Sequence, residues 1–386
     1  MRILFFSNPL TGHLLPQFPL ARALRGQGHA VAFSTPEVMA PHLAPEDFEL
    51  LLSGPSSQEV TGEVARRTGA DILFSATSQL VGEYFAGARV DLSLDEALAG
   101  ARYWEPDLIV HEHLDFVGPL VAAVLKVPSA ALAVAPALEP ETAQALAATV
   151  RARYLERGLQ IPSQVPPGQW LLDLCPPSLQ RRGALPMPPR ERVAVRPEPH
   201  RGPDGAPRAR RVQGGNRPRV LVSFDTASGA STGLGPVLRS LSALDIDLVA
   251  TTGGDPVVDP GPRAGRIELL PFTPAAELLE NVSAVVHHGG PGITFGAAAR
   301  GIPAVVVPGS VAQERQAERL ASTGAGLALP LRDRHPAQVT ATLDRLLADP
   351  GFTLAAHRLR DEIAAMPSAS RVAEWLVASV SARRTR

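Results

Sequence analysis

The sequence lacks the features that would place it in several common classes. It has a single cysteine, Cys175, so no disulfide can form within the chain and no cysteine-rich zinc site exists. No apolar run approaches the roughly 18 residues of a membrane-spanning helix. The first residues have neither the long apolar core nor the cleavage site of a signal peptide. We therefore expect a cytoplasmic protein that does not bind membranes.

An excess of charge of either sign is also missing. The 386 residues include 37 Lys and Arg and 38 Asp and Glu, which gives a net charge of −1. Such a balance provides no overall attraction to nucleic acid, so none is expected as a partner. Hydrophobic residues make up 45% of the chain, which is enough for packed cores. At roughly 150 residues per domain, the length suits about two domains.

The first part of the chain alternates apolar runs with helical patterns. Residues 2–7 form the continuous apolar run that is typical of a parallel strand buried on both faces. A helix is predicted over 16–25 and a second strand over 29–34, which together make a βαβ unit. Further buried strands are predicted at 107–112 and 130–136.

The composition changes between residues 181 and 219. This stretch holds 11 arginines, 3 acidic residues and 8 prolines, so it cannot bury a core and indicates a linker. An arm that binds phosphate or RNA is the alternative, although the stretch has no aromatic residues for base stacking.

After this stretch the α/β pattern begins again. Strands are predicted at 219–224, 247–252, 284–287 and 303–307, and helices at 236–243, 292–300 and 312–322. We expect two Rossmann-like domains whose parallel sheets face each other across a cleft. The predicted parts are an N-terminal domain (1–185), a Pro- and Arg-rich linker (186–216), a C-terminal domain (217–367), and a terminal helix (368–386) that packs back on the first domain.

A glycine-rich turn after the strand at 284–287 is the most informative motif. The unpaired N–H groups and positive dipole at the start of the next helix suit a phosphate or diphosphate. Gly289, Gly290 and Gly292 let the backbone approach an anion without a Cβ clash. The Lys-Ser/Thr of a Walker A loop is absent. A tight structural turn beside a solvated histidine is the alternative interpretation.

These motifs together resemble a known family. Residues 287–294, 301–308 and 324–326, with 9–16 and 106–112 near the start, resemble the bacterial family 1 glycosyltransferases that modify natural products and have the GT-B fold. The resemblance spans nearly the whole chain in order. It implies a metal-independent inverting transfer of the hexosyltransferase type, in antibiotic or other secondary metabolism. It also implies that the N-terminal domain (1–185) binds the acceptor and that the C-terminal domain (217–367) binds the nucleotide sugar.

The resemblance implies that His13 is the general base and that Glu112 is its partner. In the family, a histidine in the loop after the first strand deprotonates the acceptor hydroxyl. The residue types agree, because an imidazole accepts protons near neutral pH and a carboxylate fixes its tautomer. His13 as an ordinary loop histidine is the alternative.

The resemblance further implies a donor that is a nucleoside diphosphate sugar, TDP-linked and carrying a deoxysugar, with no cofactor and no metal. Phe272 would stack on the base where relatives commonly have Trp, and His288 with nearby amides would hold the diphosphate. The expected donor-binding residues are Gly12, Thr226, Phe272, Thr273, His288, Gly289, Gly290, Gly292, Ile293, Thr294 and Gln313.

The expected acceptor is a hydrophobic small-molecule aglycone. Candidates to line its pocket are Phe74, Tyr84, Phe85 and Phe116, although aromatic residues in this region also suit an ordinary core. Two pairs of residues are weak candidates for metal ligands, since no third ligand is evident: Asp245 with Asp247, and His111 with His113. A monomer or a homodimer is expected.

Three residues depart from the family pattern. Asp225 replaces a glycine near the diphosphate and would repel it if ionised. Ile293 replaces a Ser or Thr, and Ala312 replaces the Asp that commonly holds sugar hydroxyls. These departures leave an alternative open: a GT-B protein that has lost donor binding and serves as an accessory protein or as a repurposed acid–base enzyme.

Overall fold

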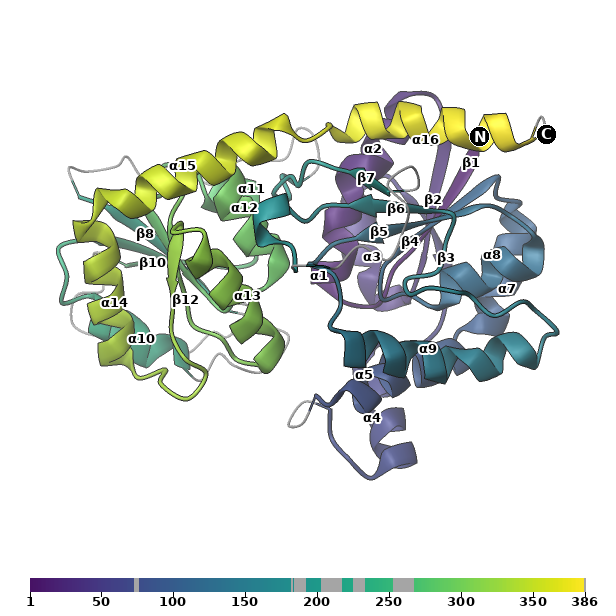
Figure 1. Cartoon of the computed structure of the whole chain (residues 1–386), viewed down its shortest axis with the longest axis horizontal. Helices are drawn as coiled ribbons and strands as arrows, with labels where there is room; N and C mark the ends of the chain where they lie inside the picture. Colours follow the sequence, from purple (N-terminus) through teal and green to yellow (C-terminus); the bar gives the residue numbers. More distant parts are fainter. Residues whose placement is uncertain are drawn as a thin grey trace. The chain divides into compact units, whose positions relative to one another are not determined.

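The described part of the chain forms two compact units. The computed structural model describes residues 1–72, 76–181, 183, 192–202, 217–224, 233–252 and 267–384 (Figure 1). The first unit comprises Met1–Cys175, Arg182–Val195 and Pro367–Arg386. The second comprises Pro176–Arg181 and Arg196–Met366.

The first unit is built on a seven-stranded parallel sheet. Its strands, in spatial order, are β3 (Glu49–Leu52), β2 (Ala30–Thr35), β1 (Arg2–Phe6), β4 (Leu108–Glu112), β5 (Ser129–Ala133), β6 (Trp170–Asp173) and β7 (Arg192–Ala194). The order reverses between β1 and β4. In open α/β sheets, ligands bind outside the carboxyl ends of the strands at such a switch point.

Helices follow most of these strands. They are α1 (Thr11–Leu14), α2 (Phe18–Gly26), α3 (Ala40–Leu43), α4 (Ser57–Thr68), α5 (Ser78–Gly82), α6 (Arg89–Asp91), α7 (Leu94–Trp104), α8 (Val117–Leu125), α9 (Pro140–Leu155) and α16 (Ala369–Arg384). A π-helical turn, η4 (Glu83–Ala88), joins α5 to α6. The helix expected over 16–25 is therefore α2, preceded by a short 3-10 turn at Leu15–Gln17.

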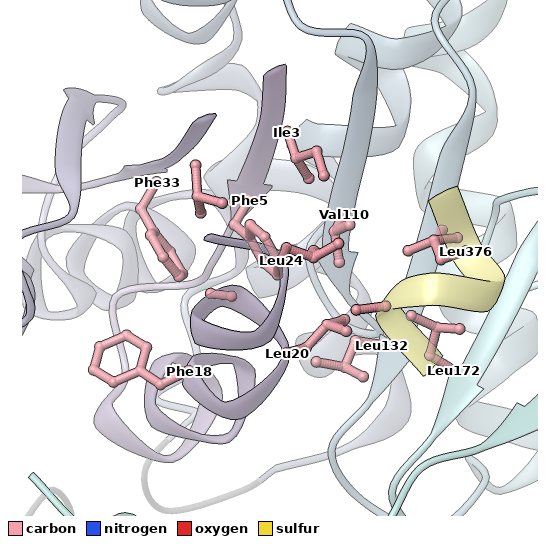
Figure 2. Packing of buried hydrophobic residues seen from close by; sticks show 14 of the residues in the cluster. Ile3, Phe5, Phe18, Leu20, Leu24, Phe33, Val110, Leu132, Leu172 and Leu376 are labelled. Carbon is pink, nitrogen blue, oxygen red and sulfur yellow. The ribbon is translucent and has the colours of Figure 1, made fainter. Parts of the chain in front are cut away.

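The central strands of the first sheet are apolar on both faces because helices cover both. Figure 2 shows one face, where Phe5 and Val110 of the sheet meet Leu20 and Leu24 of α2. Leu376 of α16 belongs to the same buried cluster. The last helix of the chain therefore completes the core of the first unit.

The second unit repeats the plan with a six-stranded parallel sheet. Its strands, in spatial order, are β10 (Ile267–Leu270), β9 (Asp247–Thr251), β8 (Arg219–Ser223), β11 (Ala284–His287), β12 (Ala304–Val306) and β13 (Gly326–Ala328). The switch point lies between β8 and β11. The helices are α10 (Leu234–Leu241), α11 (Ala275–Leu278), α12 (Pro291–Arg300), α13 (Val311–Ser322), α14 (Pro336–Ala348) and α15 (Pro350–Ala365).

The predicted class, two α/β domains with parallel sheets, is confirmed by these two sheets. The structure also differs from the sequence-based expectation in one segment. Strand β7 falls inside 186–216, the range expected to be linker, and pairs with β6. Arg192 adds a side-chain contact to this pairing, because its guanidinium donates to the buried Asp173 carboxylate of β6 at 2.7 Å. No helix in the described ranges is both long and apolar enough to cross a membrane.

The packing of α16 predicts a large cost for truncating its buried leucine. Leu376 is completely buried, so Leu376→Ala should destabilise the first unit by about 2–5 kcal/mol, through lost burial and the cavity left behind. All three tryptophans (Trp104, Trp170 and Trp375) lie in this unit, so tryptophan fluorescence during urea unfolding reports on it.

The matched control is Leu155→Ala in the same unit. Leu155 is 54% exposed, so this variant should lose less than about 1 kcal/mol. Equal losses in the two variants would contradict the packing of α16 described above.

Candidate active site

His13 and Glu112 meet at the switch point of the first sheet. His13 lies on α1, which a four-residue loop connects to β1, and Glu112 is the last residue of the neighbouring strand β4. The Nδ1 atom of His13 is 2.9 Å from Oε1 of Glu112. The carboxylate is fully buried, while the imidazole side chain is 19% exposed. The structure thus brings together the two residues that the sequence singled out.

The Glu112 carboxylate is held by further donors. Asn8, in the loop after β1, donates its side-chain amide to Oε1, and the backbone N–H of Leu114 donates to Oε2 at 2.8 Å. His113 places Nδ1 3.3 Å from Oε2. A buried carboxylate is stable as an anion only when donors surround it, and these contacts supply them.

The environment moves the two pKa values apart. Burial alone would raise the pKa of Glu112, but the charge of His13 and the hydrogen bonds from His113 and His13 hold it well below its usual range. Burial alone would lower the pKa of His13, but the charge and hydrogen bond of Glu112 outweigh it and raise that pKa above 6.5. His13 is therefore a stronger base than a solvent-exposed histidine.

Aromatic rings pack beside His13. The ring of Phe85, in the π-helical turn, stacks on the imidazole with centroids 5.8 Å apart, and Tyr84 packs edge-on against Phe85 at 4.7 Å. Both belong to a buried core cluster, as does Phe116, which has no exposed surface. Phe74, the fourth acceptor candidate, lies outside the described residues.

The glycine-rich turn occupies the switch point of the second sheet. It begins after β11, whose last residue, His287, pairs with Ser223 at the end of β8. Gly289 has φ +96°, a conformation that only glycine adopts readily. Gly290 is the N-cap of α12, no side chain caps that helix end, and proline occupies the first turn. The uncapped amides at this helix start are suited to an anion.

The two adjacent histidines have different surroundings. His287 is fully buried, and its Nδ1 accepts a hydrogen bond from the N–H of Gly289 at 3.0 Å. Burial and the neighbouring His288 lower the pKa of His287 to about 3, so it stays neutral. His288 is only half-buried, with Nδ1 3.4 Å from the Ser223 carbonyl oxygen, and a Cβ on Gly290 would overlap its Nε2. Nε2 of His288 therefore lies at the start of α12.

Other expected donor residues surround this helix start. A Cβ on Gly289 would lie 3.1 Å from the backbone oxygen of Gln313, so the start of α13 lies against the turn. Gln313 uses its side-chain oxygen to accept from the N–H of Gly309 at 2.7 Å. The Thr294 hydroxyl donates to the carbonyl of Gly290 at 2.8 Å. Gly292 and Ile293 lie in the first turn of α12.

The remaining predicted residues are more scattered. Phe272 follows the edge strand β10 and is 57% exposed. Thr273 follows Phe272, and its hydroxyl donates a hydrogen bond to the carbonyl oxygen of Pro271. Gly12 lies in the first unit, on α1 beside His13. Thr226 and Asp225 lie outside the described residues.

Two of the candidate metal ligands interact with other groups of the protein. Asp245 forms an ion pair with Arg217 at 2.9 Å, and His111 places Nδ1 3.1 Å from the backbone oxygen of Glu112. In the ranges that the structure describes, no group of three His, Cys, Asp or Glu side chains is arranged to hold a metal ion.

Sequence reasoning missed Asn8, which contacts Glu112, and two buried charged residues of the same unit, Arg89 and Asp115. Asn8 lies two residues after β1 and Asp115 three residues after β4, and a polar residue just after a buried strand is a signal that could have found them. Arg89 is fully buried in the helical segment after Phe85, and only its charge within an apolar stretch marks it.

Comparison with known proteins identifies the family. The pattern of the N-terminal domain of erythromycin biosynthesis protein CIII-like proteins matches residues 73–224, and that of their C-terminal domain matches 236–379. The elloramycin glycosyltransferase ElmGT of Streptomyces olivaceus is 31% identical, over 97% of each chain. The chain belongs to the EryCIII-like family of glycosyltransferases.

Further relatives agree with this assignment. The aclacinomycin-T 2-deoxy-L-fucose transferase of Streptomyces galilaeus is 28% identical to this EryCIII-like chain, over 95% of it and 93% of the relative. The glycosyltransferase SsfS6 of Streptomyces sp. SF2575, whose crystal structure is complexed with thymidine diphosphate, is 25% identical in sequence to this chain. It superposes with a TM-score of 0.82 over 97% of this chain and 99% of its own. The chain therefore has the fold of these natural-product glycosyltransferases, GT-B, as its motifs indicate.

The contact between His13 and Glu112 predicts the effect of neutralising the carboxylate in this EryCIII-like protein. In Glu112→Gln the negative charge that raises the pKa of His13 is gone while burial remains, so the pKa should fall below 6.5. The ring Cε1–H signal of His13, followed by NMR from pH 5 to 9, measures it. Glu59→Gln removes a carboxylate from an exposed capping box and should leave the midpoint unchanged. An unchanged midpoint in Glu112→Gln would refute the contact.

Proposed function

We propose that this protein is an inverting transferase that moves a deoxysugar from a TDP-linked donor to a hydroxyl of a hydrophobic natural product. The observation that carries the proposal is the contact between His13 and the buried Glu112 carboxylate. Both groups lie at the switch point of the first sheet, where α/β proteins bind ligands. The bound thymidine diphosphate of SsfS6 supports the choice of nucleotide. The name of the 2-deoxy-L-fucose transferase supports a deoxysugar.

The proposed base is Nε2 of His13. With Glu112 ionised, the Nδ1–H of the imidazole donates a hydrogen bond to the carboxylate. The free lone pair of the ring is therefore on Nε2. That lone pair takes the proton of the acceptor hydroxyl as its oxygen attacks the anomeric carbon. The imidazolium formed is stabilised by Glu112, as in a His–Asp pair.

A single displacement accounts for inversion. The acceptor oxygen forms a bond to the anomeric carbon while the bond from that carbon to the diphosphate oxygen breaks. The electron pair of the broken bond leaves with the nucleoside diphosphate, and the configuration at carbon inverts. The Glu112 carboxylate acts here through His13, because its oxygens are already occupied by donors.

The start of α12 is the proposed seat of the leaving diphosphate. The uncapped amides of α12 and the positive end of its dipole favour negative charge there. His288 donates from Nδ1 to the Ser223 carbonyl, so when protonated it presents an Nε2–H above Gly290. This cation neutralises charge as the diphosphate departs, and the proposed reaction therefore needs no metal.

Phe272 is the proposed platform for the base of the nucleotide. Its exposed ring follows β10, three strands away from β11. At the usual spacing of neighbouring strands, this corresponds to about 14 Å along the sheet edge. A nucleoside diphosphate lying along that edge can stack on Phe272 and reach His288.

The role of His288 predicts weaker nucleotide binding in His288→Ala. The loss of one charge-assisted hydrogen bond should raise the Kd for TDP by about tenfold or more in isothermal titration. His335→Ala removes an exposed histidine at the start of α14 in the same unit and should leave the Kd unchanged. If wild-type protein fails to bind TDP at millimolar concentration, the alternative without donor binding replaces the proposal.

The role of His13 predicts a loss of turnover without a loss of donor binding. In His13→Ala, kcat/KM for transfer from TDP-deoxysugars to polycyclic or macrocyclic aglycones should fall by about 10²–10⁴, the usual worth of a general base. The Kd for TDP should stay within about twofold of that of the wild type. His42→Ala, on α3, serves as the matched control with unchanged kcat/KM. Full activity in His13→Ala would refute the base role.

A further inference from the structure

A cavity of about 510 Å³ lies at the amino ends of strands β5 and β6 in the first unit. Ser129, the first residue of β5, and Gln169, which directly precedes β6, line it. His13 and Glu112 lie beyond the opposite, carboxyl ends of the strands of this sheet. The volume is in the usual range of small-molecule sites, so the cavity has room for a ligand of its own.

The loop before β6 forms a wall of the cavity that hydrogen bonds hold in place. Oε1 of Gln169 accepts from the N–H of Ser129 at 2.6 Å, and the side-chain amide of Gln164 donates to the carbonyl of Gly168 at 3.3 Å. Gly168 has φ +135°, and a Cβ there would lie 3.3 Å from the backbone nitrogen of Ala131 in β5. The loop is therefore held against the sheet without the help of a ligand.

Three helices supply the rest of the wall. Ala122 and Ala123 of α8, Tyr154 of α9 and Val380 of α16 line the cavity. Tyr154 is only 2% exposed, but among the described residues its hydroxyl has no hydrogen-bond partner and is not sealed from solvent, so it faces the cavity. Burial raises the pKa of Tyr154 above its usual value. The hydroxyl therefore stays protonated at neutral pH and offers a ligand a hydrogen-bond donor.

The charged side chains at the cavity are both cations. Lys126 follows α8, Arg383 lies near the end of α16, and none of the described residues that line the cavity is acidic. Arg383 also lies over the ring of Trp170, 5.0 Å from its centroid. The helices α8, α9 and α16 all end near the cavity, and each helix end carries roughly half a negative charge. Three such ends do not cancel two full positive charges, so the cavity favours an anion.

We propose that this cavity is a second ligand site, which takes a small organic anion with an apolar body. Lys126 and Arg383 attract the acidic group, and Tyr154 donates a hydrogen bond to it. The apolar body packs on Ala122 and Ala123. Because Arg383 belongs to α16, a bound anion ties the last helix of the chain to α8 and α9. The site is separate from the proposed function, since the transfer uses none of the residues that line it.

The test uses the fact that Lys126 is the only lysine of the chain. Reductive methylation with ¹³C-formaldehyde keeps the positive charge of an amine and yields one NMR signal for Lys126 and one for the Met1 amine. The Met1 nitrogen lies 3.1 Å from Nδ1 of His29, and neither residue lines the cavity, so its signal is the internal control. Lys126→Arg assigns the two signals, because arginine is not methylated.

The probe is 1-naphthoate, which carries a carboxylate on an apolar ring system. The Lys126 signal should shift to saturation with a Kd of about 1 mM or lower, as expected for a ligand of this size in a suitable pocket. The Met1 signal should stay in place. The neutral 1-naphthalenemethanol should bind about fivefold more weakly, because it lacks the charge. No saturable shift at roughly ten times the expected Kd, or equal binding of the neutral alcohol, would overturn the proposal.

Variants show where the probe binds. Arg383→Gln should raise the Kd for 1-naphthoate about two- to fivefold, the usual worth of an exposed ion pair. Arg371→Gln removes an exposed arginine from the start of the same helix and should leave the Kd unchanged. Ala123→Phe fills the cavity and should abolish the shift. Equal Kd values in the two arginine variants, or unchanged binding in Ala123→Phe, would contradict the site. If Ala123→Phe does not fold, the arginine variants decide.

These titrations need neither a sugar donor nor an acceptor, so they are independent of the proposed function. Full transfer activity in His13→Ala would remove the base role and leave the cavity proposal standing. A failure of 1-naphthoate to bind would remove the second site and leave the proposed transfer untouched.

Discussion

The structure around the candidate active site depends on keeping the Glu112 carboxylate ionised inside the first unit. A buried anion needs donors on both oxygens, and Asn8, His13 and the amide of Leu114 provide them. These donors come from the loop after β1 and from the turn after β4, which are neighbours only because the two strands pair in parallel. The same interaction raises the pKa of His13, so the fold and the basicity of the site have one cause.

Both units place polar groups by the same rule. In each sheet the strand order reverses at one point, between β1 and β4 or between β8 and β11. The first switch point carries His13 and Glu112, whose contact suits the proposed transfer of a proton. The second carries the glycine-rich turn and His288, which suit a diphosphate. In the proposed function, the two switch points serve the two halves of the transfer reaction.

The sequence predicts those parts of the molecule that local patterns determine. Apolar runs identify the central strands because parallel strands are buried on both faces, and the glycines of the turn mark the helix start. The partners of the buried charges are not local. Asn8 donates to Glu112, which lies 104 residues further along the chain, and Arg192 of β7 pairs with Asp173 of β6, so neither contact follows from composition. The proline- and arginine-rich composition around β7 instead indicated a linker.

The most direct test of this account is the pH titration of the His13 imidazole in the unmodified protein. We expect a midpoint above 6.5, with Nδ1 protonated and hydrogen-bonded to Glu112 throughout the titration. A midpoint at or below 6.5, or a neutral form protonated on Nε2, would show that the carboxylate does not support the base and would contradict the account.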